Sequence, residues 1–205
     1  HHVSGTGDMA MTFGCAEGGC TIKWDFVELP SQLLEEWLWD PQILKNVSSH
    51  YESGEPLPDH LIGQMIASKN CVSGLAIQRQ CYLALLSLEY FSEGAPSYDK
   101  TVVMEELYAK TCPNYESLEG IHTHLAFGHL MGYGSKYYSY LWSKVFALDV
   151  FDTIQQQGLL NPEIGRVYRE TILAPGNNRD PNLLLEDFLG RPPSSEPFFR
   201  DLGLN

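Results

Sequence analysis

Residues 137–158 read YYSYLWSKVFALDVFDTIQQQG, and this run decides the fold class. Apolar side chains return every three or four positions along it, as they do on one face of an α-helix. Tyr138, Leu141 and Trp142 belong to such a face, and Gly158 stands where a glycine commonly closes a helix. The run therefore predicts a long helix over residues 137–158.

The same periodicity recurs along most of the chain. It predicts further helices at residues 25–40, 41–51, 58–66, 71–91, 99–112, 161–173 and 181–189. The run over residues 71–91 is apolar enough to predict a mostly buried helix. Residues 1–24 are rich in glycine and predict loop with short strands. The chain has no internal repeat and no clear linker, so we expect one mainly α unit.

The composition argues against two classes of partner. The 205 residues include 26 acidic and 13 basic side chains, which give a net charge of −13, whereas nucleic acids and anionic membranes attract clustered Lys and Arg. No apolar run approaches the roughly 20 residues that span a bilayer, and the N-terminus lacks a basic-then-apolar signal segment. The odd count of five cysteines suits reduced thiols. We therefore expect a protein of the cytoplasm or of a mitochondrial or other organellar matrix.

A carboxylate stands at the head of the first predicted helix, in the segment WDFVELPSQ (residues 24–32). Asp25 and Glu28 have the spacing of a capping box, in which the first residue caps the helix and the second returns a hydrogen bond. On that interpretation Glu28 only satisfies a free backbone N–H. A carboxylate here also suits a zinc ion, which accepts Glu oxygens readily. The residues alone leave both interpretations open.

A second segment, GHLMGYGSKYYSYLW (residues 128–142), combines a histidine, glycines and tyrosines. On a helix, Tyr133, Tyr137 and Tyr140 would point the same way because they follow i, i+4, i+7 spacing. An aromatic face in the core is one explanation, although each buried phenol needs a hydrogen-bond partner. Phenols can also stabilise an oxyanion, and losing one such donor typically costs about 3 kcal/mol.

Both segments resemble the thimet oligopeptidase family of zinc metallopeptidases, which includes oligopeptidase A and mitochondrial intermediate peptidase. The likeness runs from about Asp25 to Leu204. It implies the fold of a zincin-type peptidase, with this chain as a multi-helix part of the C-terminal catalytic lobe. It also implies a zinc-dependent metalloendopeptidase that hydrolyses short peptides. The short Gly-Tyr-Gly loop matches the mitochondrial branch and the LPSQ sequence matches oligopeptidase A, so the subfamily stays open.

The resemblance assigns a role to each candidate site residue. Glu28 matches the family's third zinc ligand, and Asp25 would accept a hydrogen bond from a ligating imidazole. The other candidates lie in the second segment: the catalytic positions around the oxyanion match His129, Tyr133 and Tyr140, and the substrate-contacting positions match Tyr137, Gly132 and Gly134.

The His-Glu-x-x-His helix, which supplies two zinc ligands and the general base in such enzymes, does not occur in these 205 residues. The chain begins at His1-His2 without a Met, and the resemblance places these two residues just after that helix in a longer parent. The cofactor would then be one zinc ion with two histidine ligands outside this sequence. The alternative is an inactive, truncated paralogue or fragment that keeps a peptide-binding half. Such a chain would expose apolar surface and associate with a missing N-terminal lobe or with itself.

Overall fold

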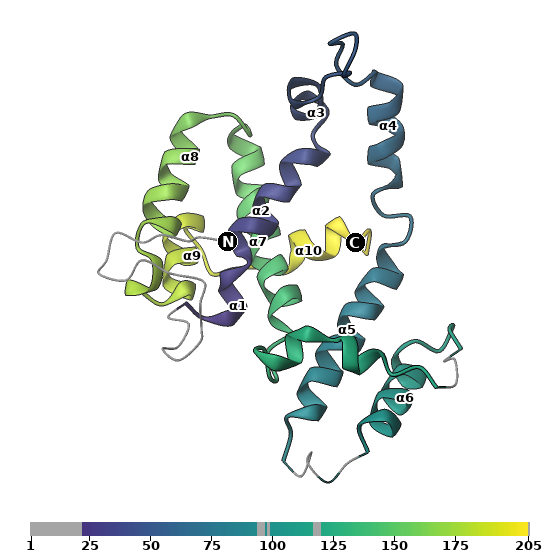
Figure 1. Cartoon of the computed structure of the whole chain (residues 1–205). Coiled ribbons are helices and arrows are strands. Elements are labelled where there is room, and N and C mark those ends of the chain that lie inside the picture. The colour runs from purple at the N-terminus through teal and green to yellow at the C-terminus, as the bar shows by residue number, and fades with distance from the viewer. Residues whose placement is uncertain (1–21, 94–96, 98, 117–119, 205) are drawn as a thin grey trace. The chain divides into compact units, whose positions relative to one another are not determined.

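The computed structural model describes residues 22–93, 97, 99–116 and 120–204. Across these ranges the regular elements are all helical, which confirms the mainly α prediction (Figure 1). Of the loop and short strands predicted for residues 1–24, residues 1–21 lie outside the described residues; Ile22 and Lys23 are not in a strand, and Trp24 already belongs to a helix. The chain divides into two compact units, although the sequence shows no linker between them. The first runs up to Cys71 and resumes at Trp142, and the second comprises Val72–Leu141.

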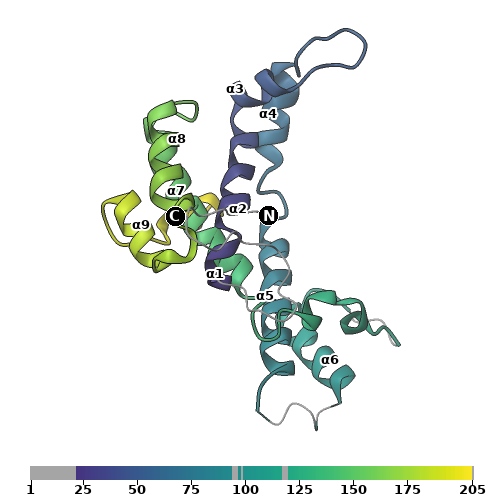
Figure 2. The ribbon, with the colours of Figure 1, turned by 60° about the vertical axis from the view of Figure 1, so that its left-hand side comes forward.

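The first unit contains most of the helices. They are α1 (Trp24–Val27), α2 (Leu29–Glu35), η1 (Glu36–Trp39), α3 (Pro41–Val47), α4 (Asp59–Ser68), α7 (Ser139–Gln157, from Trp142 onward), α8 (Pro162–Tyr168), η5 (Arg169–Leu173, a π-helix), η6 (Gly176–Asn178), α9 (Pro181–Leu189) and α10 (Glu196–Asp201). Figures 1 and 2 show α8 and α9 gathered beside α7.

Three of these helices begin in the same way, with an Asp or Asn followed by proline. The Asp40 side chain accepts from the N–H of Ile43 at 3.0 Å at the start of α3. Asp40 also accepts from the N–H of Gln42 at 2.9 Å, and Asn161 and Asp180 cap α8 and α9 with bonds equivalent to this one. Proline fits the first helical position because its missing N–H has no partner there and its φ is already helical. These starts are therefore encoded locally.

The core of the first unit joins α1 and α2 to α7, α8, η5 and α9. Leu29 and Leu33 of α2 are fully buried in it. The Ser143 hydroxyl of α7 donates to the carbonyl oxygen of Asp25 at 2.8 Å. Burying one leucine side chain contributes roughly 1.5–3 kcal/mol, so this apolar cluster fixes the segment that carries Glu28.

The second unit packs α5 (Ser73–Tyr90) against α6 (Lys100–Thr111), followed by η3 (Thr123–Ala126), η4 (Gly128–Met131) and the first residues of α7. Asp99 caps α6 by accepting from the N–H of Thr101 at 2.9 Å. Its core is small and consists of Tyr82, Leu86, Met104 and Cys112 with partly buried neighbours.

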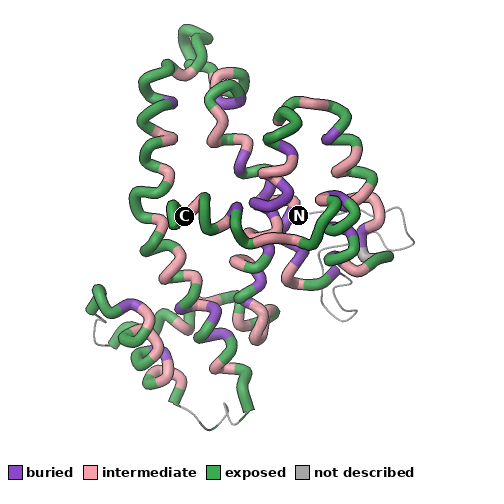
Figure 3. Tube along the Cα trace, turned by 180° about the vertical axis from the view of Figure 1, so that it is seen from behind, coloured by how far each residue is buried: buried purple, intermediate pink, exposed green. Residues whose placement is uncertain are grey.

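Several predicted helices differ from the observed ones. The prediction of a mostly buried helix at residues 71–91 is wrong, because Leu75, Leu85 and Leu88 of α5 are exposed. Figure 3 colours the trace of the described residues by burial. The helix predicted over 41–51 ends at Val47, and the one over 161–173 changes to a π-helix at Arg169. Among the described helices, none combines the length and apolar character that crossing a bilayer requires.

Candidate functional site

Glu28 lies at the junction between α1 and α2 and is the C-cap of the first and the N-cap of the second. Pro30 is the second residue of α2 and has no N–H for a carbonyl of α1, so a new helix begins instead of one continuing. The Glu28 side chain is only 6% exposed. The Ser31 hydroxyl lies within hydrogen-bond reach of both the Oε2 and the carbonyl oxygen of Glu28, at 2.9 Å each.

The predicted capping box is not formed. Lys23, not Asp25, is the N-cap of α1, and neither α1 nor α2 has a side-chain hydrogen bond at its cap. Asp25 therefore lies inside the first turn of α1 and does not cap it. The assignment of Glu28 as a zinc ligand stays a prediction.

The donor set around Glu28 tests whether these residues fit zinc. Within the described ranges, no three His, Cys, Asp or Glu side chains come close enough together to hold a metal ion. Glu28 fits as one donor, because a buried carboxylate gains from a cation beside it. A structural or catalytic zinc needs at least two more protein ligands. Among the described residues, Glu28 can therefore supply one zinc donor, and no complete zinc site is formed.

The tyrosine segment does not form the single helical face that its spacing predicts. Only Tyr140 is helical, in the first turn of α7, whereas Tyr133 and Tyr137 precede that helix. The backbone turns tightly here, because the N–H of Tyr133 donates to the carbonyl of His129 at 2.7 Å. Ser135 adopts a positive φ of 57°, which is uncommon outside glycine and marks a turn.

The turns nevertheless gather all three tyrosines around the exposed His129 of η4. Its ring centroid lies 5.5 Å from that of Tyr133, 5.1 Å from Tyr137 and 5.6 Å from Tyr140. The rings of Tyr133 and Tyr140 are stacked, with centroids 5.9 Å apart and an interplanar angle of 11°. Four groups that can donate hydrogen bonds thus share one neighbourhood, which we call the His129 cluster.

Tyr137 is the buried member of the His129 cluster, with 7% of its side chain exposed. Burial raises the pKa of its phenol, and a hydrogen bond from Gln80 and the charge of Arg79 offset this only in part. The phenol therefore remains protonated, and able to donate, at neutral pH.

Two glycines of the segment differ in their surroundings. A Cβ added at Gly134 would lie 2.8 Å from the Cε1 atom of Phe91, at the end of α5, so the ring packs directly on the glycine. A Cβ at Gly132 would meet nothing within 4 Å. Close approach therefore explains the glycine at 134, and no contact explains the one at 132.

A cavity of about 740 Å³ adjoins the His129 cluster within the second unit. Its walls come from α5, α6, η3 and the following loop, and the lining includes His129 and Tyr137. Sequence reasoning missed this cavity and the contact of Phe91 with Gly134. The lining residues of α5 and α6 form no recognisable motif. Because α5 was predicted to be mostly buried, no cavity was expected beside it.

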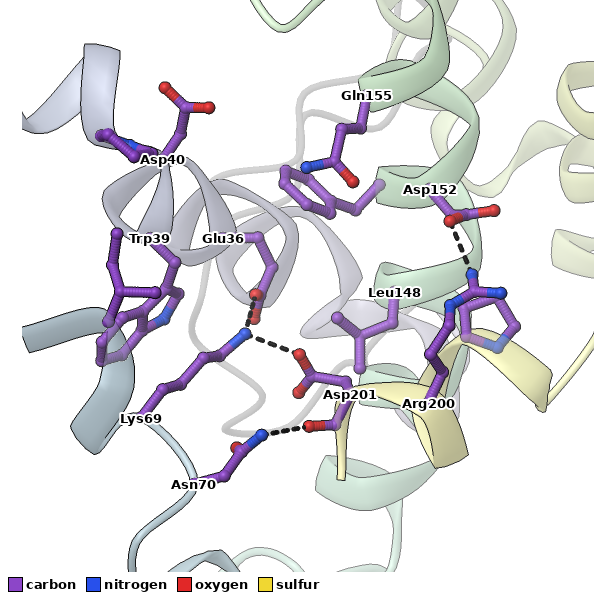
Figure 4. Close-up of a pocket in the computed structure, with 14 residues that line it drawn as sticks. Glu36, Trp39, Asp40, Lys69, Asn70, Leu148, Asp152, Gln155, Arg200 and Asp201 are labelled. Carbon is purple, nitrogen blue, oxygen red and sulfur yellow. Dashed lines mark hydrogen bonds and ion pairs between the residues drawn. The ribbon is translucent and has the colours of Figure 1, made fainter. Parts of the chain in front are cut away.

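A second cavity, of about 400 Å³, lies in the first unit around a buried ion-pair network (Figure 4). Glu36 is 2% exposed, and its two carboxylate oxygens accept from Lys144 and Lys69 at 2.5 and 2.9 Å. Lys69 also donates to Asp201 of α10 at 2.6 Å, and Asn70 donates to the carbonyl of Asp201 at 2.7 Å. These bonds tie η1, α7, α10 and the residues after α4 together.

The chain is similar to known peptidases along most of its length. A family model described as Peptidase family M3 matches residues 14–204. Oligopeptidase A of Escherichia coli (strain K12) is 35% identical over 189 residues, which is 89% of this chain and 27% of the relative. Saccharolysin of Saccharomyces cerevisiae is 35% identical over 193 residues, 91% of this chain and 27% of the relative. Mitochondrial intermediate peptidase of Arabidopsis thaliana is 32% identical over 174 residues, 84% of this chain and 24% of the relative. The chain thus spans about a quarter of the length of these curated relatives.

Proposed function

Because this chain belongs to peptidase family M3, as its two segments suggested, we propose that it carries part of the active site of a zinc-dependent metalloendopeptidase that hydrolyses short peptides. The observation that carries the proposal is the grouping of Tyr133, Tyr137 and Tyr140 around His129. We propose the cytoplasm or an organellar matrix as its location.

Glu28 would be one zinc ligand, and the other two would come from a His-Glu-x-x-His segment outside this sequence. Bound zinc would supply Lewis acidity and a water of lowered pKa. The burial of Glu28 supports this role because a carboxylate shielded from water binds a cation more strongly. The bond from Ser31 restricts the rotation of the carboxylate and orients it.

Tyr140 and Tyr133 would donate hydrogen bonds to the peptide carbonyl oxygen as it gains negative charge. Neutral donors fixed before the reaction act strongly in a site shielded from water. Their stacked rings hold the two phenols side by side. His129 contacts both rings, and Tyr137, with Gly132 and Gly134, would contact the bound peptide.

The 205 residues alone are expected to lack peptidase activity, since a single carboxylate does not hold zinc tightly. In that state the chain would act as a peptide-binding module. The observation favouring this second function is the cavity of about 740 Å³ next to the His129 cluster.

The test uses the longer zinc-loaded protein that includes the His-Glu-x-x-His segment. Tyr140→Phe is expected to lower kcat by about 10²–10³-fold with little change in KM, because it removes a donor and keeps the ring. Tyr138→Phe is the matched control, since Tyr138 lies two residues away and is exposed. Equal rates for the two variants would contradict the role of Tyr140.

Zinc content tests Glu28 separately. Glu28→Gln is expected to lose most of the bound zinc, as measured by metal analysis after gel filtration, whereas the exposed Glu35→Gln on α2 should retain it. A Glu28→Gln protein with a full complement of zinc would rule out Glu28 as a ligand.

A further inference from the structure

The cavity of the second unit is large enough for a small organic ligand, since ligand pockets commonly measure about 300–1,000 Å³. Aromatic and aliphatic side chains dominate its wall: Tyr82, Leu83, Leu86, Tyr108, Tyr115, Phe127 and Tyr137. Tyr82 and Tyr108 meet edge to face at 5.3 Å, as do Phe127 and Tyr137 at 5.0 Å. The aromatic rings of the wall can pack edge to face in the same way against an aromatic ring of a ligand.

The wall of the cavity also carries a positive charge, from Arg79. Among the described residues that line it, Arg79 of α5 is the one Lys or Arg, and none is Asp or Glu. This contrasts with a chain that carries 26 acidic and 13 basic side chains. Among the ion pairs of the described residues, none involves the Arg79 guanidinium. A guanidinium without a carboxylate partner at an apolar cavity favours an anionic ligand.

From this lining we propose that the cavity binds the aromatic side chain of a peptide whose nearby carboxylate pairs with Arg79. The choice of a peptide rests on the proposed peptidase function, because His129 and Tyr137 belong both to the cavity wall and to the His129 cluster. The carboxylate is either the C-terminus of the peptide or an acidic side chain next to the ring. The cavity is thus a specificity site that selects anionic, aromatic peptides.

Calorimetric titration of the 205-residue chain in EDTA tests the proposal with two matched pairs of peptides. The first pair is acetyl-Gly-Ala-Phe as free acid and as amide, and the second is acetyl-Asp-Phe-amide and acetyl-Asn-Phe-amide. We expect a preference of about tenfold or more for the charged member of one pair, as for a charge-assisted hydrogen bond. The first pair reports a C-terminal carboxylate and the second an acidic side chain. The absence of binding, or of any preference, overturns the proposal. So does equal binding when alanine replaces the phenylalanine.

Variants locate the binding in the cavity. Arg79→Gln should abolish the charge preference and Arg79→Lys should keep part of it, whereas Lys110→Gln on α6 should change nothing. Ala126 of η3 is exposed and lines the cavity, so Ala126→Trp should fill the cavity with a large ring and remove binding. Ala109→Trp makes the same change at an exposed position of α6 that does not line the cavity, and should bind like the wild type. Unchanged binding in Arg79→Gln or Ala126→Trp overturns the assignment.

These outcomes separate the cavity from the proposed activity, because binding in EDTA requires neither zinc nor hydrolysis. If binding depends on Arg79 and Ala126 while the longer zinc-loaded protein fails to hydrolyse peptides, the proposed function fails and the cavity site stands. If the longer protein hydrolyses peptides while Arg79→Gln binds normally, the cavity assignment alone is overturned.

Discussion

Replacing Glu36 with alanine is expected to destabilise the first unit by about 3 kcal/mol. The Glu36 carboxylate is 2% exposed and joins Lys69 and Lys144. Removing one partner of a buried ion pair costs about 3–5 kcal/mol, because the remaining charge stays buried and unpaired. The lysine side chains are 20% and 22% exposed, so their amines can regain some water. The cost should therefore lie at the low end of that range.

Urea denaturation followed by tryptophan fluorescence measures this cost in the first unit alone. All four tryptophans of the chain belong to that unit: Trp24, Trp37, Trp39 and Trp142. Glu35→Ala is the control, since Glu35 is the exposed neighbour of Glu36, and it should stay within about 0.5 kcal/mol of the wild type. A loss below 1 kcal/mol for Glu36→Ala would refute the argument that this carboxylate is held as a buried ion pair.

The remaining predictions concern acid stability, the glycine turn and the core. Burial alone would raise the pKa of Glu36, but the bonds from the two lysines hold it below its usual value. The stabilisation is then complete above the unfolded pKa of about 4.3 and is lost as pH falls through the folded pKa, so Glu36→Gln should show a shallower acid decline in tryptophan fluorescence. Gly134→Ala should destabilise the second unit by about 1–3 kcal/mol through its clash with Phe91, measured by thermal circular dichroism. Adding Phe91→Ala should relieve that clash, and a double variant no more stable than Gly134→Ala would contradict it. Leu33→Ala, fully buried, should cost about 2–5 kcal/mol by urea denaturation, whereas its exposed neighbour Leu34→Ala should stay within about 0.5 kcal/mol.

The sequence predicted the start of a helix correctly where two adjacent residues supply a cap and a proline. Asp40-Pro41 and Asp180-Pro181 combine a cap with a proline at the first helical position, and the helices begin there. The burial of α5 was mispredicted because apolar content does not say how many neighbours a helix has. Leu85 and Leu88 face away from the small core of the second unit, and nothing in their own sequence distinguishes them from Leu86.

The local structure of the carboxylate segment was predicted wrongly, and the role of Glu28 stays a prediction. A capping box requires one continuous helix after Asp25, and Pro30 interrupts the hydrogen-bond ladder. The break leaves Glu28 at a junction where its side chain is buried. The proline was visible in the sequence, so the position of the break could have been predicted from Pro30 alone.

The tyrosine cluster shows how a correct grouping can follow from a wrong structural reason. The prediction grouped Tyr133, Tyr137 and Tyr140 by helical spacing. In the structure they are grouped by turns, in which the Tyr133 N–H donates to the carbonyl of His129 and Gly134 packs against Phe91. A single helix would fix the three phenols in a row along one face. The turn instead stacks Tyr133 on Tyr140 and leaves the buried Tyr137 on the wall of the cavity. The rings of Tyr133 and Tyr140 are therefore stacked, and that of Tyr137 borders the cavity in which we propose an aromatic side chain of the peptide.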